Sequence, residues 1–326
     1  MFLERLEVEG FKSYSLPTEM HFNPGIGVVI GNNGVGKSNI MDAISWGLGD
    51  NDLTRLRCYG QEDLFFSGSK DYPPAPAARV LLTLSQGTEK TAPRVNLERQ
   101  MTRSGEDHYL SENNPVSREA FLNRITELGL VDTLKTLIRQ EQLNDWLRSD
   151  SVDRLTDVLA FLGNGIKPSG VDQFVHNWNK GFQHYYAMLL PEVDCRLYAE
   201  EAKGAKGLEI EIRFTDKGLK KSKLLSGGER TVTSLAAKLA LFDQLQSPIY
   251  LLDEVEPALD YVNHKRMQEL LKDLAKRKQL IMITHLRSTI ELANTLHGVR
   301  TRRDGSSFMK FYFVMDKRLL RLYKCC

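Results

Sequence analysis

One octapeptide constrains this chain more than any other feature. Residues 31–38 read Gly-Asn-Asn-Gly-Val-Gly-Lys-Ser and fit the pattern G-x-x-x-x-G-K-[ST]. The β-branched stretch 26–30 before it predicts a buried strand, and apolar residues at helical spacing follow from Lys37 until Gly49. Glycines let backbone N–H groups curl around a phosphate, and the start of the following helix adds positive partial charge. The sequence therefore predicts a phosphate-binding loop in an α/β fold.

The last two residues of this loop have separate expected roles. Lys37 is expected to reach the β- and γ-phosphates of a nucleoside triphosphate, and the Ser38 hydroxyl to ligate Mg²⁺. The alternative is a glycine-rich turn with an incidental lysine. The strand before the loop and the helix after it favour the phosphate site.

Two later strands are expected to end at polar residues. The apolar stretch 249–252 ends at Asp253 and Glu254, and the stretch 280–283 ends two residues before His285. Ligands bind beyond the carboxyl ends of parallel strands. We therefore expect Asp253 to hold Mg²⁺ through water, Glu254 to polarise the attacking water and His285 to contact the γ-phosphate. The alternatives are a solvated acidic turn and a structural histidine.

A second anion-binding turn is predicted at Ser226-Gly227-Gly228, which opens a helix with one apolar face. One nucleotide in one phosphate loop does not need a second such turn, and the alternative is an ordinary serine N-cap. Two phosphate-sensing turns in one chain predict that a second copy supplies one of them in trans.

The remaining pattern predicts strands that alternate with helices, and hence a largely parallel sheet with an antiparallel flank. Strands are expected near 79–84, 94–101, 107–111, 193–198 and 208–214, and helices across 117–128, 131–138, 151–162 and 171–189.

The helices 151–162 and 171–189 carry apolar residues at alternating steps of three and four, as coiled coils do. The alternative is two amphipathic helices packed on the body of the protein. A Gly- and Pro-rich linker, 163–170, joins them. The sequence thus predicts an N-terminal lobe at 1–162 and a C-terminal lobe at 171–326.

Composition excludes several classes of protein. Hydrophobic residues make up 41% and charged residues 26%, which is typical of folded proteins. No apolar run approaches the ~18–20 residues that span a bilayer, and the N-terminus has no signal-peptide core, so we expect a soluble cytoplasmic protein. The four cysteines form no C-x-x-C pair, which argues against a zinc ribbon or a disulfide scaffold.

The net charge of +2 does not indicate a nucleic-acid binder, but residues 300–326 hold eight basic and two acidic residues. Together with the lysines of 217–223, this basic tail permits contacts with DNA phosphates or an acidic protein. The alternative is a solvated basic face.

The order of phosphate loop, glutamine, Leu-Ser-Gly-Gly-Glu, Asp-Glu and His resembles the ABC-type ATPase family. More narrowly, it resembles the head of the structural maintenance of chromosomes (SMC) proteins. The narrower resemblance covers nearly the whole chain and rests on the segments 10–14, 37–44, 62–69, 253–260 and 283–285. It implies an α/β head with a P-loop sheet, an antiparallel flanking sheet, two lobes and short coiled-coil roots.

The resemblance also implies roles for single residues. Gln140 resembles the lid glutamine that joins Mg²⁺ to the attacking water, although Glu141 stands where the family usually has glycine. Arg57 is similar to the arginine finger near the phosphates, and Asp260 to the loop aspartate that couples two sites. Glu256-Pro257 replaces the commoner Asp-Ala, which is expected to stiffen that loop. The implied nucleotide contacts, with Ser226, Gly227 and Gly228 acting across a dimer, are Lys12, Asn32, Asn33, Gly34, Val35, Gly36, Lys37, Ser38, Asn39, Arg57 and Asp260, and the implied Mg²⁺ ligands are Ser38, Gln140 and Asp253.

The function implied by the resemblance is that of a Mg-dependent ATPase head in chromosome condensation and segregation. Two heads would close around two ATP molecules, with DNA and a kleisin-type subunit as partners, no membrane contact and a cytoplasmic, nucleoid-associated location. One alternative is a DNA-repair ATPase of the RecF, RecN or zinc-hook class, and a weaker one is the nucleotide-binding subunit of a transporter. A G-protein is excluded because Asn-Lys-x-Asp is absent.

One departure from SMC proteins is large. Long arms and a hinge domain separate the two halves of their heads, whereas here only residues 163–170 join the two halves. The simplest account is an engineered head whose arms were cut near their roots and whose lobes were fused. A naturally armless relative is the alternative.

Overall fold

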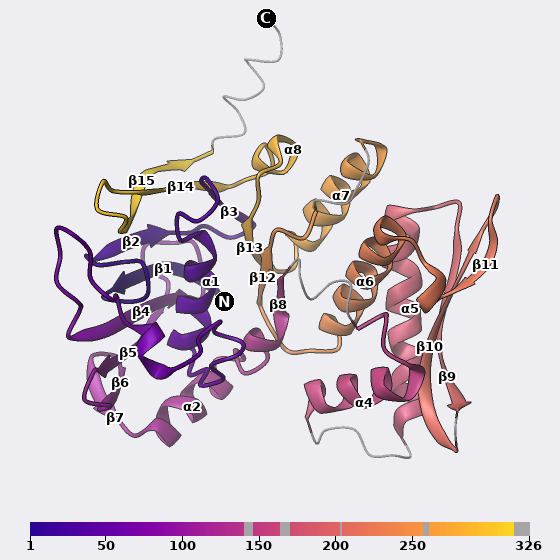
Figure 1. Cartoon of the computed structure of the whole chain (residues 1–326), viewed down its shortest axis with the longest axis horizontal. Helices are drawn as coiled ribbons and strands as arrows, with labels where there is room; N and C mark the ends of the chain where they lie inside the picture. The colour runs from indigo at the N-terminus through magenta and orange to yellow at the C-terminus, as the bar shows by residue number, and fades with distance from the viewer. Residues whose placement is uncertain (140–145, 164–169, 203, 257–260, 316–326) are drawn as a thin grey trace, which may run out of the picture. The chain divides into compact units, whose positions relative to one another are not determined.

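The computed structural model of the chain divides into two compact units (Figure 1). It describes residues 1–139, 146–163, 170–202, 204–256 and 261–315. Unit 1 comprises Met1–Leu137, Ser247–Asp253 and Leu274–Cys326, and unit 2 comprises Ile138–Gln246 and Glu254–Asp273. Each unit therefore combines segments that are distant in sequence. The two predicted lobes divide the chain by sequence order, whereas the two units do not, and the lobes stay a prediction. Linker residues 164–169 lie outside the described residues.

Unit 1 contains an antiparallel sheet with the strand order β2-β1-β4-β5-β6-β7. Alternating apolar residues of β1 face the core, as in Leu6 and Val8, while Glu7 and Glu9, which follow each of them, are partly exposed. The strands are β1 (Phe2–Glu9), β2 (Thr18–His21), β4 (Ala77–Ser85), β5 (Arg94–Thr102), β6 (Asp107–Ser111) and β7 (Asn114–Val116).

The second sheet is mostly parallel and has the order β15-β14-β3-β13-β12-β8. Its strands β3, β12 and β13 are buried almost throughout, as expected for a sheet covered on both faces. Strand β15 runs antiparallel to its neighbour β14. The strands are β3 (Ile26–Ile30), β12 (Ile249–Asp253), β13 (Gln279–Ile283), β14 (Thr295–Thr301), β15 (Ser307–Val314) and β8 (Leu137–Arg139), where the chain passes to unit 2. The predicted combination of a parallel sheet with an antiparallel flank is confirmed.

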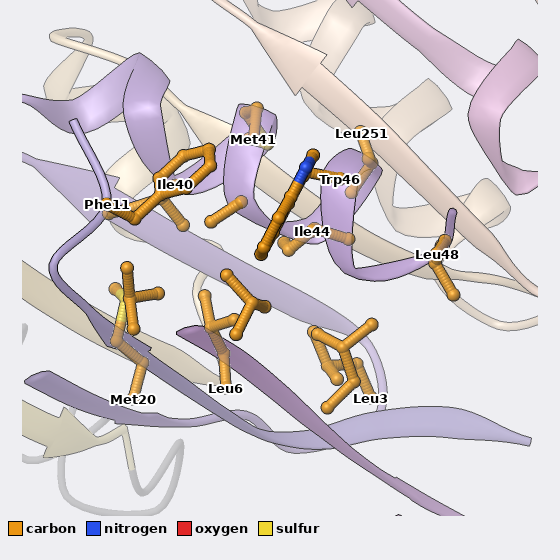
Figure 2. Packing of buried hydrophobic residues seen from close by; sticks show 14 of the residues in the cluster. Leu3, Leu6, Phe11, Met20, Ile40, Met41, Ile44, Trp46, Leu48 and Leu251 are labelled. Carbon is orange, nitrogen blue, oxygen red and sulfur yellow. The ribbon is translucent and has the colours of Figure 1, made fainter. Parts of the chain in front are cut away.

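Helix α1 (Lys37–Gly47) joins the two sheets of unit 1, since it packs against β4, β5 and β12. Its residues Ile40, Ile44 and Trp46 are fully buried and share one core with Leu3 and Leu6 of β1 (Figure 2). The loop that precedes α1 is therefore anchored to a rigid core. The smaller helices of this unit are η1 (Gln61–Leu64), α2 (Arg118–Glu127), η2 (Thr133–Thr136) and α8 (Arg287–Ile290).

Unit 2 packs helices against a three-stranded antiparallel sheet of order β11-β10-β9. Its elements are α4 (Ser151–Leu162), α5 (Val171–Leu189), β9 (Asp194–Ala202), β10 (Ala205–Phe214), β11 (Gly218–Lys221), η4 (Ser222–Leu224), α6 (Gly227–Phe242) and α7 (Tyr261–Leu274). The apolar residues of α5 at heptad-like spacing are buried, and α5 packs against α6 and β9, while α4 packs against β10 and β9. At the length present here, both helices pack on the body of unit 2.

The helix expected at 131–138 is wrong. The chain forms the short 3₁₀ helix η2 and then strand β8 instead. The hydroxyl oxygen of Thr136 lies 2.9 Å from Thr133 O and 2.7 Å from Ile249 O, which share its one proton, and that of Thr133 lies 3.0 Å from Ser247 Oγ. Buried threonine hydroxyls that bond to local and distant backbone offer this segment an alternative to a continued α-helix.

Candidate nucleotide-binding site

The predicted phosphate loop connects β3 to α1 in unit 1. Gly34 and Gly36 have φ values of 77° and 92°, in the left-handed region that favours glycine. Asn32, Asn33 and Gly34 are exposed, whereas Val35 is buried against the core. The loop is thus fixed on its inner side and open on the side where a ligand would enter.

Lys37 folds back over this loop. It is only 5% exposed, and its Nζ donates hydrogen bonds of 3.0 Å to the carbonyls of Gly31 and Asn32. A buried ammonium group beside the exposed residues of such a loop favours an anionic ligand. Ser38 follows as the second residue of α1 and is half-buried.

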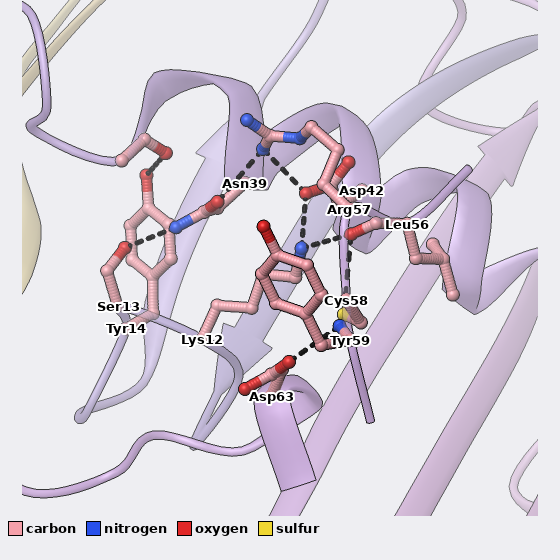
Figure 3. Close-up of polar contacts among 11 residues, drawn as sticks. Lys12, Ser13, Tyr14, Asn39, Asp42, Leu56, Arg57, Cys58, Tyr59 and Asp63 are labelled. Carbon is pink, nitrogen blue, oxygen red and sulfur yellow. Dashed lines mark hydrogen bonds and ion pairs between the residues drawn. The ribbon is translucent and has the colours of Figure 1, made fainter. Parts of the chain in front are cut away.

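Two cations beside the loop share one buried carboxylate (Figure 3). Asp42 on α1 is fully buried, and its Oδ2 accepts hydrogen bonds of 2.6 Å from Lys12 Nζ and from Arg57 Nη2. Lys12 also donates to Leu56 O, and Arg57 donates to Asn39 Oδ1 at 3.0 Å. The structure therefore gathers Lys12, Asn39 and Arg57, three of the residues expected to contact nucleotide.

A pocket of about 560 Å³ lies next to this cation pair. The aromatic ring of Tyr59 is fully exposed at its edge, and Tyr59 N donates to Asp63 Oδ2 at 2.7 Å. The pocket is lined by Lys12, Ser13, Asn39, Arg57, Tyr59, Glu62, Asp63, Phe65, Phe66, Ser67, Gly68, Ser69, Asp304 and Gly305. This volume lies within the range of small-molecule sites.

Asp253 lies at the same edge of the sheet as the phosphate loop. In the parallel register Asp253 of β12 is level with Ile283 of β13, which is level with Val29 of β3, one residue before the strand ends. Asp253 is 7% exposed. The exposed His285 follows β13 and lines a pocket of about 310 Å³ together with Asn32 of the loop. The structure brings together the predicted loop, acid and histidine at the carboxyl ends of β3, β12 and β13.

Five non-glycine residues in the described part of the chain have positive φ. Glu112 and Asn113 form the turn between β6 and β7, and the other three are Lys12 (48°), Arg57 (56°) and Glu254 (52°). Backbone strain of this kind clusters at functional sites. The sequence assigned all three to the site, Lys12 and Arg57 through the family resemblance and Glu254 through its place after a strand, and their roles stay predictions.

The residues present fit Mg²⁺ by their chemistry. Ser38 and Asp253 offer hard oxygen donors, and Mg²⁺ is commonly held by one or two protein oxygens together with substrate phosphates and waters. Within the described ranges, no group of three or more His, Cys, Asp or Glu side chains forms a metal cage of its own. Such a donor set suits a metal ion that arrives with a nucleotide.

The Ser226 turn belongs to unit 2, where Ser226 is the N-cap of α6. Ser226 and Gly227 are exposed, and Ser226 N–H donates to Glu229 Oε2 at 2.7 Å in a capping box. The preceding helix η4 is held by buried Arg154, which donates to Ser222 Oγ and lies 3.4 Å from Glu209. Buried contacts thus hold the segment before the turn, while Ser226 and Gly227 of the turn itself are exposed.

Glu229 organises the charges around this turn. Burial alone would raise its pKa, but hydrogen bonds from the Ser226 N–H, Lys220 and Lys217 outweigh that effect and lower the pKa to about 2. The lysines lie 3.0 and 3.3 Å from its carboxylate. Two of the lysines expected to meet DNA therefore neutralise a carboxylate of the same chain.

Two expected site residues, Gln140 and Asp260, lie outside the described residues, as do residues 316–326 of the basic tail. Sequence reasoning did not single out Asp42, Tyr59 or Ser307, all of which the structure places around the loop or its pocket. Asp42 could have been found from the sequence, because a carboxylate on the apolar face of a helix needs buried partners.

The model of the RecF/RecN/SMC N-terminal domain family matches residues 2–307. The chain belongs to this family. The crystal structure of an SmcHead bound to the C-winged helix domain of ScpA superposes with a TM-score of 0.83 at 29% identity, covering 98% of this chain and 100% of that one. The SMC head domain from Thermotoga maritima gives a TM-score of 0.68 at 30% identity, covering 97% and 100%. The predicted SMC-type ATPase head is confirmed.

Relatives named "Chromosome partition protein Smc" match parts of this SMC head. The protein from Mycobacterium tuberculosis is 38% identical over 190 residues, which is 57% of this chain and 16% of that protein. The protein from Bacillus subtilis is 36% identical over 158 residues, 47% of this chain and 13% of that protein. The chain thus spans a small part of the length of these relatives. The described helices include none that is both long and apolar enough to cross a bilayer.

Proposed function

We propose that this SMC head binds ATP with Mg²⁺ and hydrolyses it to ADP and phosphate. The observation that supports this most is the shared sheet edge, where the loop with Lys37 follows β3 and Asp253 ends β12. A phosphate cradle and a carboxylate at the same edge of one parallel sheet are the parts that P-loop ATPases use.

In this proposal the loop N–H groups and Lys37 bind the β- and γ-phosphates, and Ser38, Asp253 and Gln140 hold Mg²⁺. The metal ion, when bound, neutralises phosphate charge as hydrolysis proceeds. Glu254 accepts a proton from the attacking water, and His285 contacts the γ-phosphate. Asn32, Asn33, Gly34, Val35, Gly36 and Asn39 shape the cradle.

The pocket beside Lys12 and Arg57 is the proposed place for the ribose and base. It adjoins Asn39, the third residue of α1, and offers the exposed ring of Tyr59 for stacking. The two cations, held by Asp42, add positive potential on the side of the α-phosphate.

Two heads are proposed to close around two nucleotides, so that Ser226, Gly227 and Gly228 of one head face the γ-phosphate in the other. Asp260 would couple the two sites. The exposure of Ser226 and Gly227 at the start of α6 supports this, since an uncovered helix N-terminus is ready to receive an anion.

The wider role we propose is chromosome condensation and segregation, with DNA and a kleisin-type subunit as partners in the cytoplasm, on the nucleoid. The names of the relatives and the ScpA complex of a similar head support this role. We propose strand β15 as the kleisin surface, because it forms a sheet edge and exposes Tyr312, Phe313 and Val314. Phe313→Lys should abolish capture of a kleisin winged-helix domain, whereas Lys310→Glu should not.

The decisive test of the ATPase proposal is Glu254→Gln. The change removes the proton acceptor and preserves the shape of the side chain, so hydrolysis should fall by about 10²–10⁴-fold while ATP binding persists. ATP should then trap a dimer, visible by size exclusion with light scattering. Glu291→Gln, at an exposed acid that follows α8, is the control. Hydrolysis by Glu254→Gln at the wild-type rate would remove Glu254 from its proposed role.

A further inference from the structure

Two carbonyl groups of the phosphate loop are held by side chains from outside it. Val35 O accepts a hydrogen bond of 2.7 Å from Ser307 Oγ, at the start of β15. Gly36 O accepts one of 3.1 Å from the Tyr14 hydroxyl, whose pKa is raised by burial so that it remains a donor. Both contacts reach the loop from elements distant in the sequence.

Ser307 also joins the segment that carries Lys12 and Ser13. Its N–H donates to Ser13 O at 2.7 Å, the two serine hydroxyl oxygens lie 2.7 Å apart, and Asn39 Nδ2 donates to Ser13 Oγ at 2.8 Å. A serine hydroxyl has one proton and accepts two hydrogen bonds. The Ser307 hydroxyl is placed to donate both to Ser13 Oγ and to Val35 O, so these two acceptors share its one proton.

The two hydroxyls close tightly around Gly36. A Cβ atom at this position would lie 2.3 Å from Ser307 Oγ and 2.4 Å from Ser13 Oγ. Gly36 also has a φ of 92°. The space around the last loop glycine is therefore defined by this pair of serines, and Ser307 itself is fully buried.

The direction of the Val35 carbonyl determines the direction of a loop N–H. In a planar trans peptide the C=O and the following N–H point to opposite sides. A hydroxyl that fixes Val35 C=O on the inner side therefore turns Gly36 N–H toward the outer side, and Tyr14 does the same for Lys37 N–H. Successive N–H groups that point the same way form the concave site that binds phosphate oxygens.

We propose that Ser307, acting through Val35 and together with Ser13, is a positioning residue for phosphate binding. It holds one peptide of the loop in the orientation that binds nucleotide before the nucleotide arrives. This rests on the proposed function, namely that the loop binds ATP. The β14–β15 hairpin thereby contributes to a site formed by the N-terminal part of the chain.

The test compares Ser307→Ala with Ser306→Ala by calorimetric titration with ATP and ADP. Ser306 is buried to the same extent, but its hydroxyl bonds to Asp304 within the hairpin turn. Ser307→Ala should bind both nucleotides about five- to tenfold more weakly, because one pre-set N–H is lost from a cradle that both ligands use. Ser306→Ala should stay within about twofold of wild type.

The increase in melting temperature that ATP produces separates a positioning role from a role in folding. The melting temperature without nucleotide should drop similarly in both variants, while the increase produced by ATP should shrink only in Ser307→Ala. Ser13→Ala provides a second test if Ser307→Ala does not fold. The double variant should lose about as much affinity as the larger single variant, since both serines act through one chain of hydrogen bonds.

The outcomes distinguish the two proposals. If wild type binds ATP no better than Lys37→Ile, the proposed function fails. If wild type binds ATP but Ser307→Ala and Ser13→Ala bind equally well, only the positioning role is overturned. Additive losses in the double variant would also overturn it.

Discussion

The phosphate loop of unit 1 and the Ser226 turn of unit 2 are both glycine-rich turns at the start of a helix, yet they differ in charge. The loop carries the buried cation Lys37, and its carbonyls are fixed by Tyr14 and Ser307. The Ser226 turn carries an acid, Glu229, in the first turn of its helix. A carboxylate at that place already satisfies part of the positive helix end.

This difference indicates that the phosphate loop and the Ser226 turn have separate roles in nucleotide binding. The loop has the charge and the fixed geometry to bind a nucleotide within one chain. The Ser226 turn has exposed donors, but the charges of Lys217 and Lys220 beside it are partly neutralised by Glu229. It is suited to contribute only when a nucleotide bound elsewhere is brought to it.

The largest predicted effect separates these roles directly. Lys37→Ile should weaken ATP binding to a single head by about 10²-fold or more, through loss of a buried charge-assisted contact. Ser226→Arg should leave that binding within about twofold and abolish hydrolysis, because its bulk blocks the second head. Titration calorimetry and phosphate release at several protein concentrations measure both.

Mixing these two variants sharpens the comparison. A mixed dimer contains one intact loop opposite one intact Ser226 turn, so some activity should return unless both sites must be occupied. Ser104→Arg, in the exposed β5–β6 turn, is the control for added bulk. Activity per head that does not change with concentration would contradict the shared site.

A smaller effect is expected at the carboxylate that holds the cations of unit 1. Asp42→Asn should lower the free energy of unfolding by about 2–4 kcal/mol, because Lys12 and Arg57 lose their buried counter-charge. Urea denaturation measures this, with Asp52→Asn as the exposed control. An unchanged urea midpoint would contradict this prediction, because it would show that the Asp42 charge is not needed to balance Lys12 and Arg57.

The corresponding acid of unit 2 should matter less. Glu229→Gln should cost about 1 kcal/mol, typical of a helix cap. Because the folded state lowers the pKa of Glu229 from its usual 4.5 to about 2, its ionic contribution is present above pH 4.5 and is lost as the pH falls toward 2. The stability difference between wild type and variant should therefore narrow between pH 5 and pH 2. A difference that widens on acidification would contradict this assignment.

The smallest effect concerns DNA. If the lysines after β10 contact phosphates, exposed Lys223 should contribute more than Lys220, which is paired with Glu229. Lys223→Gln should reduce the slope of log affinity against log salt by about one, and Lys220→Gln by less. Binding that does not depend on salt would exclude these lysines from the interface.

The parts of the fold that were predicted correctly are those encoded locally. The octapeptide 31–38 contains the glycines, the helix start and the lysine within one turn of chain, and strands such as β12 and β13 are short apolar runs that end at polar residues. The segment 131–138 was assigned wrongly because its conformation depends on threonine hydroxyls that bond to residues more than 100 positions away.

The same reasoning explains which parts of the site were missed. Ser307 lies 272 positions from Val35, and no spacing rule connects a hairpin serine with a loop carbonyl. Lys12 and Arg57 were expected at the site, but their shared partner Asp42 was not, because the segment after β1, helix α1 and the loop after α1 meet only through the folded core. The roles of Gln140, Asp260 and the other site residues stay predictions.

The left-handed backbone of Glu254 has a consequence for laboratory evolution. Glycine and asparagine adopt a φ of 52° with less strain than glutamate does. Replacement of Glu254 by either residue should therefore raise thermal stability slightly. A library selected for heat resistance alone should therefore accumulate such replacements at position 254, whereas selection for growth dependent on ATP turnover should eliminate them. The two selections would therefore favour different residues at position 254, as expected where a residue is kept for its chemistry at a cost in stability.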